Sequence, residues 1–269
     1  MKISRRELIK IITPFMSSKI SFAKDIYLTK NENQIYIPIL MYHDINPFKK
    51  DLYTVSPSQF ASQMEFLYIN GYSPIFPSQL ENMEFIKNIK KPIIITFDDA
   101  YASILEYGFP YLEYYNFKFV INVIGEYVGK YINFENFNRP VLSWDELNYL
   151  LDSGLCEIGY HGYSIHIHNW INKIDLSSFE KDIDIFYEKI RKYLNIDRID
   201  ILAFPYGQYR EIFIKSAVKK GFRYLMTSDE GILKVNLIEN PEFMLMPRLN
   251  VDYRLDLLSF KEYIGGSGL

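Results

Sequence analysis

Three of the four histidines in this 269-residue chain lie within eight residues of one another, at His161, His166 and His168. Imidazole nitrogens are common ligands of zinc and of other first-row metals, so such a cluster in a histidine-poor chain favours a metal site. Two imidazoles and one carboxylate would leave coordination positions open for water, which is typical of a catalytic site. His168 is the weakest of the three candidates, and we interpret it as a residue beside the ligands or on the surface.

The carboxylates for such a site are present at Asp98 and Asp99, and the fourth histidine is His43. Two adjacent side chains at the end of a strand point in different directions, so one can bind a cation while the other faces a neighbouring site. Taken alone, the Asp pair is better explained as a turn residue followed by a helix N-cap. The histidine cluster is what favours a metal-binding role for one of the two carboxylates.

The elements that must position these residues follow from hydrophobic periodicity. Short apolar runs predict buried strands, and amphipathic segments with Ser, Pro and Gly at their ends predict helices. The predicted strands are 34–42, 92–97, 118–124, 155–160, 199–204, 222–227 and 244–251. The predicted helices are 57–70, 101–115 (broken or kinked at Pro110), 144–152, 177–194, 209–220 and 256–264.

Strands and helices alternate seven or eight times, which predicts an α/β fold with a parallel sheet covered on both faces. The number of units fits a (β/α) barrel, regular or distorted, and a doubly wound open sheet is the alternative. Asp98, His43 and His161 each directly follow a predicted strand. Because the carboxyl ends of parallel strands open on one face, we expect these side chains to meet there. No glycine-rich nucleotide-binding motif follows any of the strands.

Composition excludes several other classes of protein. The chain is 48% hydrophobic, which excludes a disordered chain, and its net charge of −3 gives no basic excess for binding nucleic acid. The single cysteine, Cys156, excludes an intramolecular disulfide and a cysteine-cluster metal site.

The first residues read as a targeting segment. Residues 4–10 (SRRELIK) resemble the twin-arginine export signal, a short apolar stretch follows, and Ser21-Phe22-Ala23 offers small residues for cleavage. A basic amphipathic helix is the alternative. We expect a signal segment at 1–23, a linker at 24–33 and a catalytic domain at 34–269, exported to the periplasm or beyond. No segment is apolar enough to span a membrane.

Three motifs recur in order at the predicted strand ends. Residues 96–99 (TFDD) resemble the T-F-D-D motif of the NodB-homology polysaccharide deacetylases, carbohydrate esterase family 4. Residues 157–161 (EIGYH) and 204–207 (FPYG) resemble two further motifs of that family, and the resemblance spans residues 36–252. The exported deacetylases of poly-N-acetylglucosamine biofilm exopolysaccharide are the most similar subgroup, because residues 41–44 (MYHD) resemble their first strand end.

The resemblance implies a role for each candidate residue. Asp99, His161 and His166 become ligands of a divalent metal, with zinc the expected ion and nickel, cobalt or iron the alternatives. Asp98 becomes the general base. His43 takes the place of the general acid, which most of the family supplies from near the C-terminus.

The turn after the 199–204 strand has its own implied role and one departure from the family. The backbone N–H of Tyr206 is expected to bind the oxyanion, with Pro205 beside the substrate. The family's base-orienting arginine is replaced by Ala203, so Arg248 or Arg139 would have to supply that charge.

These residues predict metal-dependent hydrolysis of N-acetyl groups from N-acetylglucosamine-type residues of a cell-surface or secreted polysaccharide. The alternatives are a deacetylase of peptidoglycan or of an amino-sugar lipid, and a non-catalytic carbohydrate-binding protein on the same fold. The expected partner is a polysaccharide or oligosaccharide, and nucleic acid is not expected.

Overall fold

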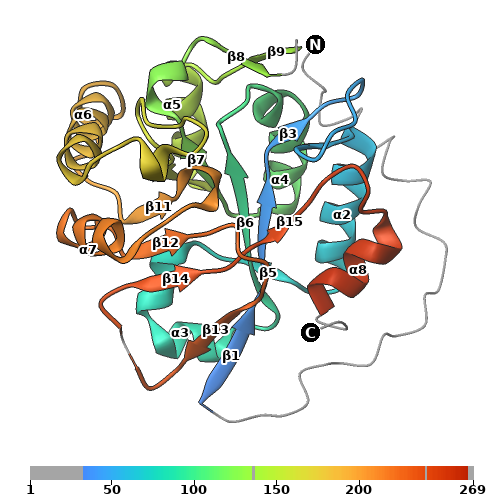
Figure 1. The fold of residues 1–269 in the computed structure, drawn as a ribbon. Coiled ribbons are helices and arrows are strands. Elements are labelled where there is room, and N and C mark those ends of the chain that lie inside the picture. Colours follow the sequence, from blue (N-terminus) through green and yellow to red (C-terminus); the bar gives the residue numbers. More distant parts are fainter. Residues whose placement is uncertain (1–32, 135–136, 240, 266–269) are drawn as a thin grey trace.

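The computed structural model describes residues 33–134, 137–239 and 241–265, and its centre is a curled parallel sheet (Figure 1). Eight strands follow one another in the order β14-β12-β11-β10-β7-β6-β2-β15, and β5 (Ser73–Pro74) pairs with β6 beside this path. The expected (β/α) barrel is therefore confirmed in a distorted form. The eight strands are β2 (Ile39–Tyr42), β6 (Pro92–Asp98), β7 (Phe119–Val123), β10 (Cys156–Tyr160), β11 (Ile201–Ala203), β12 (Tyr224–Met226), β14 (Met244–Met246) and β15 (Leu249–Asn250).

The strands are apolar on both faces because both faces are covered. In β6 every residue is buried, and its side chains alternate between two cores. Ile94 packs with Val120 and Ile201 inside the curled sheet, whereas Ile93 and Ile95 belong to the larger core under the helices. Because side chains alternate along a strand, the residues of β6 that face into the curled sheet are Ile94, Thr96 and, at the strand's end, Asp98.

Helices cover the outside of the sheet, with α6 and α7 on one side and α2 and α8 on another (Figure 1). Two of these helices begin with the N-cap residues that the sequence predicts, because Ser56 and Ser143 each form a capping box. The helices are α2 (Pro57–Ile69), α3 (Met83–Asn88), α4 (Phe109–Tyr115), α5 (Trp144–Asp152), α6 (Leu176–Leu194), α7 (Glu211–Lys219) and α8 (Leu257–Gly265).

Two predicted elements are divided. The single strand expected at 34–42 is wrong, because Pro38 has no N–H to donate and separates β1 (Gln34–Ile37) from β2. β1 pairs antiparallel with β13 (Leu233–Asn236), a strand that the sequence analysis missed. The helix expected at 101–115 has α-helical geometry only from Phe109, after a π-helical turn at Ile104–Gly108.

The segment 244–251 is also two strands rather than one, and the division shows how the sheet closes. β14 pairs with β12 at one edge of the sheet, whereas β15 pairs with β2 at the other edge. Only Pro247 and Arg248 separate the two strands. Three residue steps span about 10 Å at most, so the two edges of the sheet approach each other there. We call this crossing the seam.

The remaining described strands are two short pairs beyond the main sheet. β3 (Asp44–Ile45) pairs with β4 (Thr54–Val55), and β8 (Tyr131–Phe134) forms a hairpin with β9 (Phe137–Pro140). Neither was predicted. Within the described residues, no helix is long and apolar enough to cross a membrane. The proposed signal segment at 1–23, and all of the linker except residue 33, lie outside the described residues.

Candidate metal centre

The residues singled out from the sequence meet at the carboxyl ends of the parallel strands. His43 follows β2, Asp98 ends β6 with Asp99 after it, and His161 follows β10. β2, β6, β7 and β10 are consecutive neighbours in the sheet, which brings groups more than 100 residues apart to one rim. Pro205 follows β11 on the same rim.

Asp99, His161 and His166 converge on a common point. One ligand atom from each lies within 4.8 Å of the other two. Oδ1 of Asp99 is 3.6 Å from Nε2 of His161 and 3.7 Å from Nε2 of His166, too far for hydrogen bonds. That same oxygen is buried and has no hydrogen-bond partner among the described residues. A buried carboxylate oxygen facing two imidazole nitrogens at this separation fits a divalent cation between them.

The surroundings of the two imidazoles suit metal binding. Nδ1 of His161 lies 2.8 Å from the carbonyl oxygen of Ala203, which can only accept, so Nδ1 donates there and Nε2 is the nitrogen that faces Asp99. Burial and the neighbouring His161 lower the pKa of His166 to about 4. His166 is therefore unprotonated at neutral pH, as metal binding requires.

The loop between the two histidines is held by a carboxylate from α6. Asp182, which is buried, accepts hydrogen bonds from the backbone N–H groups of Tyr163 (2.6 Å) and Ser164 (2.8 Å) and from the Tyr160 hydroxyl (2.7 Å). Gly162 turns the chain with a φ of +87°, where an added Cβ would lie 3.3 Å from the backbone nitrogen of His166. These contacts hold the turn that lets His161 and His166, five residues apart in the sequence, face the same point.

His168 lies outside the ligand group. It is exposed, and its ring meets the edge of Tyr206 at 5.9 Å between centroids. The ring of Tyr206 stacks instead on His166, at 4.7 Å and an interplanar angle of 25°. Tyr206 has a left-handed backbone (φ 55°), which is uncommon for a residue with a side chain. Tyr206 is 45% exposed, and its ring covers one face of His166.

Asp98 forms a buried ion pair rather than joining the ligands. Arg248 donates to its Oδ1 at 2.7 Å from Nη1 and to its Oδ2 at 2.8 Å from Nη2, and both residues are almost fully buried. Burial alone would raise the pKa of Asp98, but the charge of Arg248 and the hydrogen bonds that it donates outweigh this effect. The pKa of Asp98 therefore lies well below its usual range.

The structure distinguishes between the two arginines that could replace the family's base-orienting residue. Arg248 lies on the seam, where its Nε also donates to the carbonyl of Thr227 at 2.8 Å, and its side chain reaches Asp98. Arg139 lies on β9 and pairs with Asp44 and Asp51 instead. Ala203, at the position of the family's arginine, is fully buried in the core inside the curled sheet.

His43 is buried at the same rim, with its Nδ1 lacking a hydrogen-bond partner. The ring of Tyr53 meets it edge-on at 5.2 Å between centroids. Burial lowers the pKa of His43, and the carboxylates of Asp98 and Asp99 act in the opposite direction.

Nδ2 of Asn122, on β7, donates to Oδ1 of Asp98 at 2.7 Å. The sequence analysis missed three residues that contact the site: Asn122, Asp182 and Tyr53. Asn122 and Asp182 carried a usable signal, because each is a polar residue in an otherwise apolar run or stripe. Tyr53 carried none, since it is one of 23 tyrosines.

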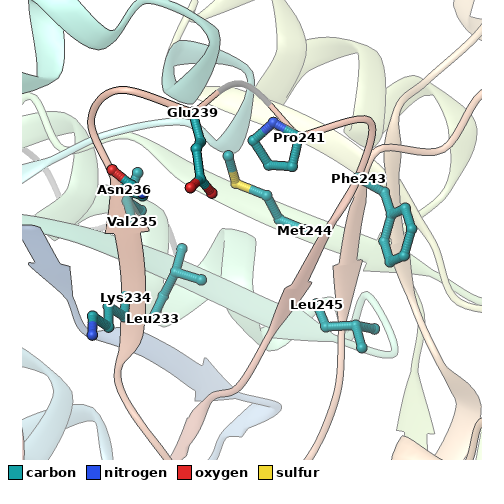
Figure 2. Close-up of a pocket in the computed structure, with 9 residues that line it drawn as sticks. All are labelled: Leu233, Lys234, Val235, Asn236, Glu239, Pro241, Phe243, Met244 and Leu245. Carbon is teal, nitrogen blue, oxygen red and sulfur yellow. The ribbon is translucent and has the colours of Figure 1, made fainter. Parts of the chain in front are cut away.

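The hollow shown in Figure 2 is separate from this centre. It has a volume of about 230 Å³ and is lined by residues of β13 and β14 and the segment between them, including Leu233, Val235, Phe243 and Met244. Its lining contains no histidine and none of the residues at the rim. It is therefore not where the groups capable of hydrolysis meet.

Comparison with known sequences agrees with this geometry. A sequence model of the polysaccharide deacetylase family matches residues 86–225, which is 140 of the 269 residues. The match covers more than half of the chain and includes Asp98, Asp99, His161 and His166. The chain belongs to the polysaccharide deacetylase family.

Individual relatives extend the comparison. The chain is 27% identical over 210 residues to YxkH of Bacillus subtilis, covering 75% of this chain and 68% of that protein. It is 29% identical over 187 residues to the poly-beta-1,6-N-acetyl-D-glucosamine N-deacetylase of Staphylococcus epidermidis, covering 66% and 62%. The chain thus spans about two thirds of the length of these relatives. The solved structure of IcaB from Ammonifex degensii has the same fold (TM-score 0.71, 22% identity, 86% of this chain and 97% of that chain).

Proposed function

We propose that this protein is a metal-dependent N-deacetylase of an N-acetylglucosamine-containing polysaccharide of the cell surface or of a secreted biofilm matrix. The observation that carries the proposal is the buried, unpartnered Oδ1 of Asp99 facing Nε2 of both His161 and His166. Family membership and the activity for which the Staphylococcus epidermidis relative is named support the same substrate class.

Asp99, His161 and His166 would hold the metal, zinc being the expected ion and nickel, cobalt or iron the alternatives. A divalent ion bound there supplies Lewis-acid chemistry, because it polarises the acetamide carbonyl and acidifies the attacking water. Three protein ligands leave coordination positions open, which suits a catalytic ion rather than a structural one.

The protein's own groups then move the protons. Asp98, kept ionised by Arg248, takes a proton from the attacking water. His43, when protonated, donates to the nitrogen of the leaving amine, so that the amino sugar departs neutral. The backbone N–H of Tyr206 donates to the developing oxyanion, and Pro205 before it shapes the turn against the substrate.

Export belongs to the same proposal. Residues 1–23 would act as a twin-arginine-like signal, residues 24–33 as a linker and residues 34–269 as the catalytic domain. Cell fractionation of an expressing culture tests this. The wild-type protein is expected outside the cytoplasm, and Arg5→Lys with Arg6→Lys is expected to retain it inside.

The decisive experiment measures acetate released from N-acetylglucosamine oligomers of β-1,6 linkage, with β-1,4 oligomers and peptidoglycan fragments as comparison substrates. We expect release from the β-1,6 oligomers by metal-loaded protein, loss of release with a chelator, and recovery on adding zinc. Absence of acetate from every substrate, with one metal ion bound per chain, would contradict the proposed activity.

A further inference from the structure

Asn122 is a fully buried amide one strand away from Asp98. It lies in β7, where the residues around it are apolar, and it is in register with Asp98 on β6 and with Gly159 on β10. All three positions belong to the inward-facing alternation of the sheet. Neither the metal ligands nor the proposed acid requires an amide there.

The amide has one orientation that the surroundings allow. Nδ2 of Asn122 donates to Oδ1 of Asp98 at 2.7 Å, and a carboxylate can only accept, so the oxygen must face away. That oxygen is buried without a hydrogen-bond partner and lies against the backbone of Gly159. A Cβ on residue 159 would stand 2.1 Å from it, so only glycine leaves room for the amide.

The hydrogen bonds divide the two oxygens of Asp98 between different tasks. Oδ1 accepts from both Asn122 and Arg248 Nη1, which uses its two lone pairs. Within the part of the chain that the structure describes, Oδ2 accepts only from Arg248 Nη2, which leaves it a lone pair. It is also the oxygen nearer the metal ligands, 3.7 Å from Nε2 of His161.

We infer that Asn122 is a positioning residue that commits Oδ2 of Asp98 to accepting the proton, and that Gly159 serves the reaction by making room for it. The inference rests on the proposed hydrolytic function of Asp98. Without the amide, the carboxylate can rotate about its side-chain bonds and share Arg248 between its oxygens differently. The oxygen that accepts the proton from the attacking water would then no longer have a fixed orientation.

The test compares five proteins: the wild type, Asn122→Ala, Asn122→Asp, Gly159→Ala and the double variant Asn122→Ala with Gly159→Ala. Asn122→Asp has the same shape but replaces the N–H donor with a second carboxyl group beside Asp98. Two substrates are used, N-acetylglucosamine oligomers and 4-nitrophenyl acetate, and metal content is measured for each protein. Thermal unfolding of the metal-free proteins gives a readout independent of turnover.

We expect Asn122→Ala and Asn122→Asp to lower kcat about 10- to 100-fold, with KM within about twofold and one metal ion still bound per chain. Gly159→Ala should do the same, because its Cβ displaces the amide. The double variant should be no slower than Asn122→Ala. Its Tm should exceed that of Gly159→Ala because the clash of the added Cβ with the amide is gone, whereas the 2.8 Å approach of that Cβ to Cγ2 of Ile201 is common to both variants.

Ile121→Ala is the matched control, since Ile121 is equally buried on the same strand but packs in the core under the helices. It should lower Tm without lowering kcat. The inference is overturned if folded, metal-loaded Asn122→Ala keeps kcat within twofold, if Ile121→Ala loses as much, or if the two single effects simply multiply in the double variant. A wild type that cleaves the ester but not the oligomers refutes the proposed substrate instead, and the ester and unfolding comparisons still decide the role of Asn122.

Discussion

Asp98 and Glu157 are carboxylates on the inward-facing side of the same parallel sheet, yet their surroundings differ completely. Asp98 ends β6 at the rim and accepts three hydrogen bonds, two of them from a buried guanidinium. Glu157 lies near the start of β10, where the Ser78 hydroxyl donates to one oxygen and the other oxygen is buried without a partner. Burial raises the pKa of Glu157 to about 7 against the opposing hydrogen bond from Ser78.

The contrast shows that position inside the sheet does not decide the charge of a carboxyl group. What decides it is the supply of donors, above all a cation. At the rim, Arg248 makes a buried anion stable, which a proton acceptor needs. Near the start of β10 no guanidinium reaches Glu157 among the described residues, so its partial burial favours the neutral acid. Four sets of substitutions test this difference.

Removing the charge of Asp98 should lower turnover more than any of the other substitutions. Asp98→Asn should lower acetate release about 10²- to 10⁴-fold, the usual range for a lost general base, while metal binding persists. Asp99→Asn should instead weaken metal binding itself. Metal titration of both variants checks the division, and equal loss of metal in the two would contradict it.

The second change addresses the proton donor. His43→Gln should lower deacetylation about 10²- to 10³-fold, because the amine leaves poorly without a proton. The loss should be much smaller with 4-nitrophenyl acetate, whose leaving group needs no proton. Comparing the two substrates at one pH checks this. An equal loss on both would mean that His43 has another role.

The third change removes the cation from Asp98. Arg248→Met should destabilise the fold by about 3 to 5 kcal/mol at pH 7, since it leaves a buried carboxylate without its partner. The folded-state pKa of Asp98 is depressed, so the ion pair stabilises the protein above the unfolded pKa of about 3.9 and is lost as pH falls through the folded value. Urea unfolding at pH 7 and pH 3 should therefore show a smaller difference between variant and wild type at the lower pH.

The smallest effect is expected at Glu157, whose pKa is shifted in the opposite direction to that of Asp98. Glu157 has a folded-state pKa raised from 4.5 to about 7, so its burial costs nothing below the unfolded value and an increasing amount as pH rises toward 7. Glu157→Gln should therefore be more stable than the wild type at pH 8, by roughly 2 kcal/mol, and no more stable at pH 4. Turnover should not change. A stability difference that does not vary with pH would show that Glu157 is already paired.

The convergence of the candidate ligands could be predicted because each follows an apolar strand, and parallel strands end on one face. The choice between Arg248 and Arg139 could not be predicted, since it depends on a partner 150 residues away from Arg248 in the sequence. The strand boundaries failed where proline intervened, at Pro38 and at Pro247. Periodicity describes the burial of a segment and not its hydrogen-bond partners.

Asn122 and Asp182 show a different limit. Each was visible as a polar residue in an apolar setting, Asp182 beside Phe179 and Ile183 on the buried stripe of α6. That pattern says that a partner must exist, because an unpaired buried polar group is costly. It does not say which partner, and in both cases the partner lies on a segment that only the folded chain brings near.

The seam at Pro247–Arg248 has a consequence for the order in which the molecule is completed. Asp98 and Arg248 are joined only after the chain has closed a loop of 150 residues, and contacts of such long range form slowly. Arg248 also follows the first seven parallel strands along the chain, so it emerges last from the ribosome among the groups that hold Asp98. Until β15 docks beside β2, the carboxylate has no counter-charge. Hydrolytic activity during refolding should consequently report the closing of the sheet rather than the formation of its strands.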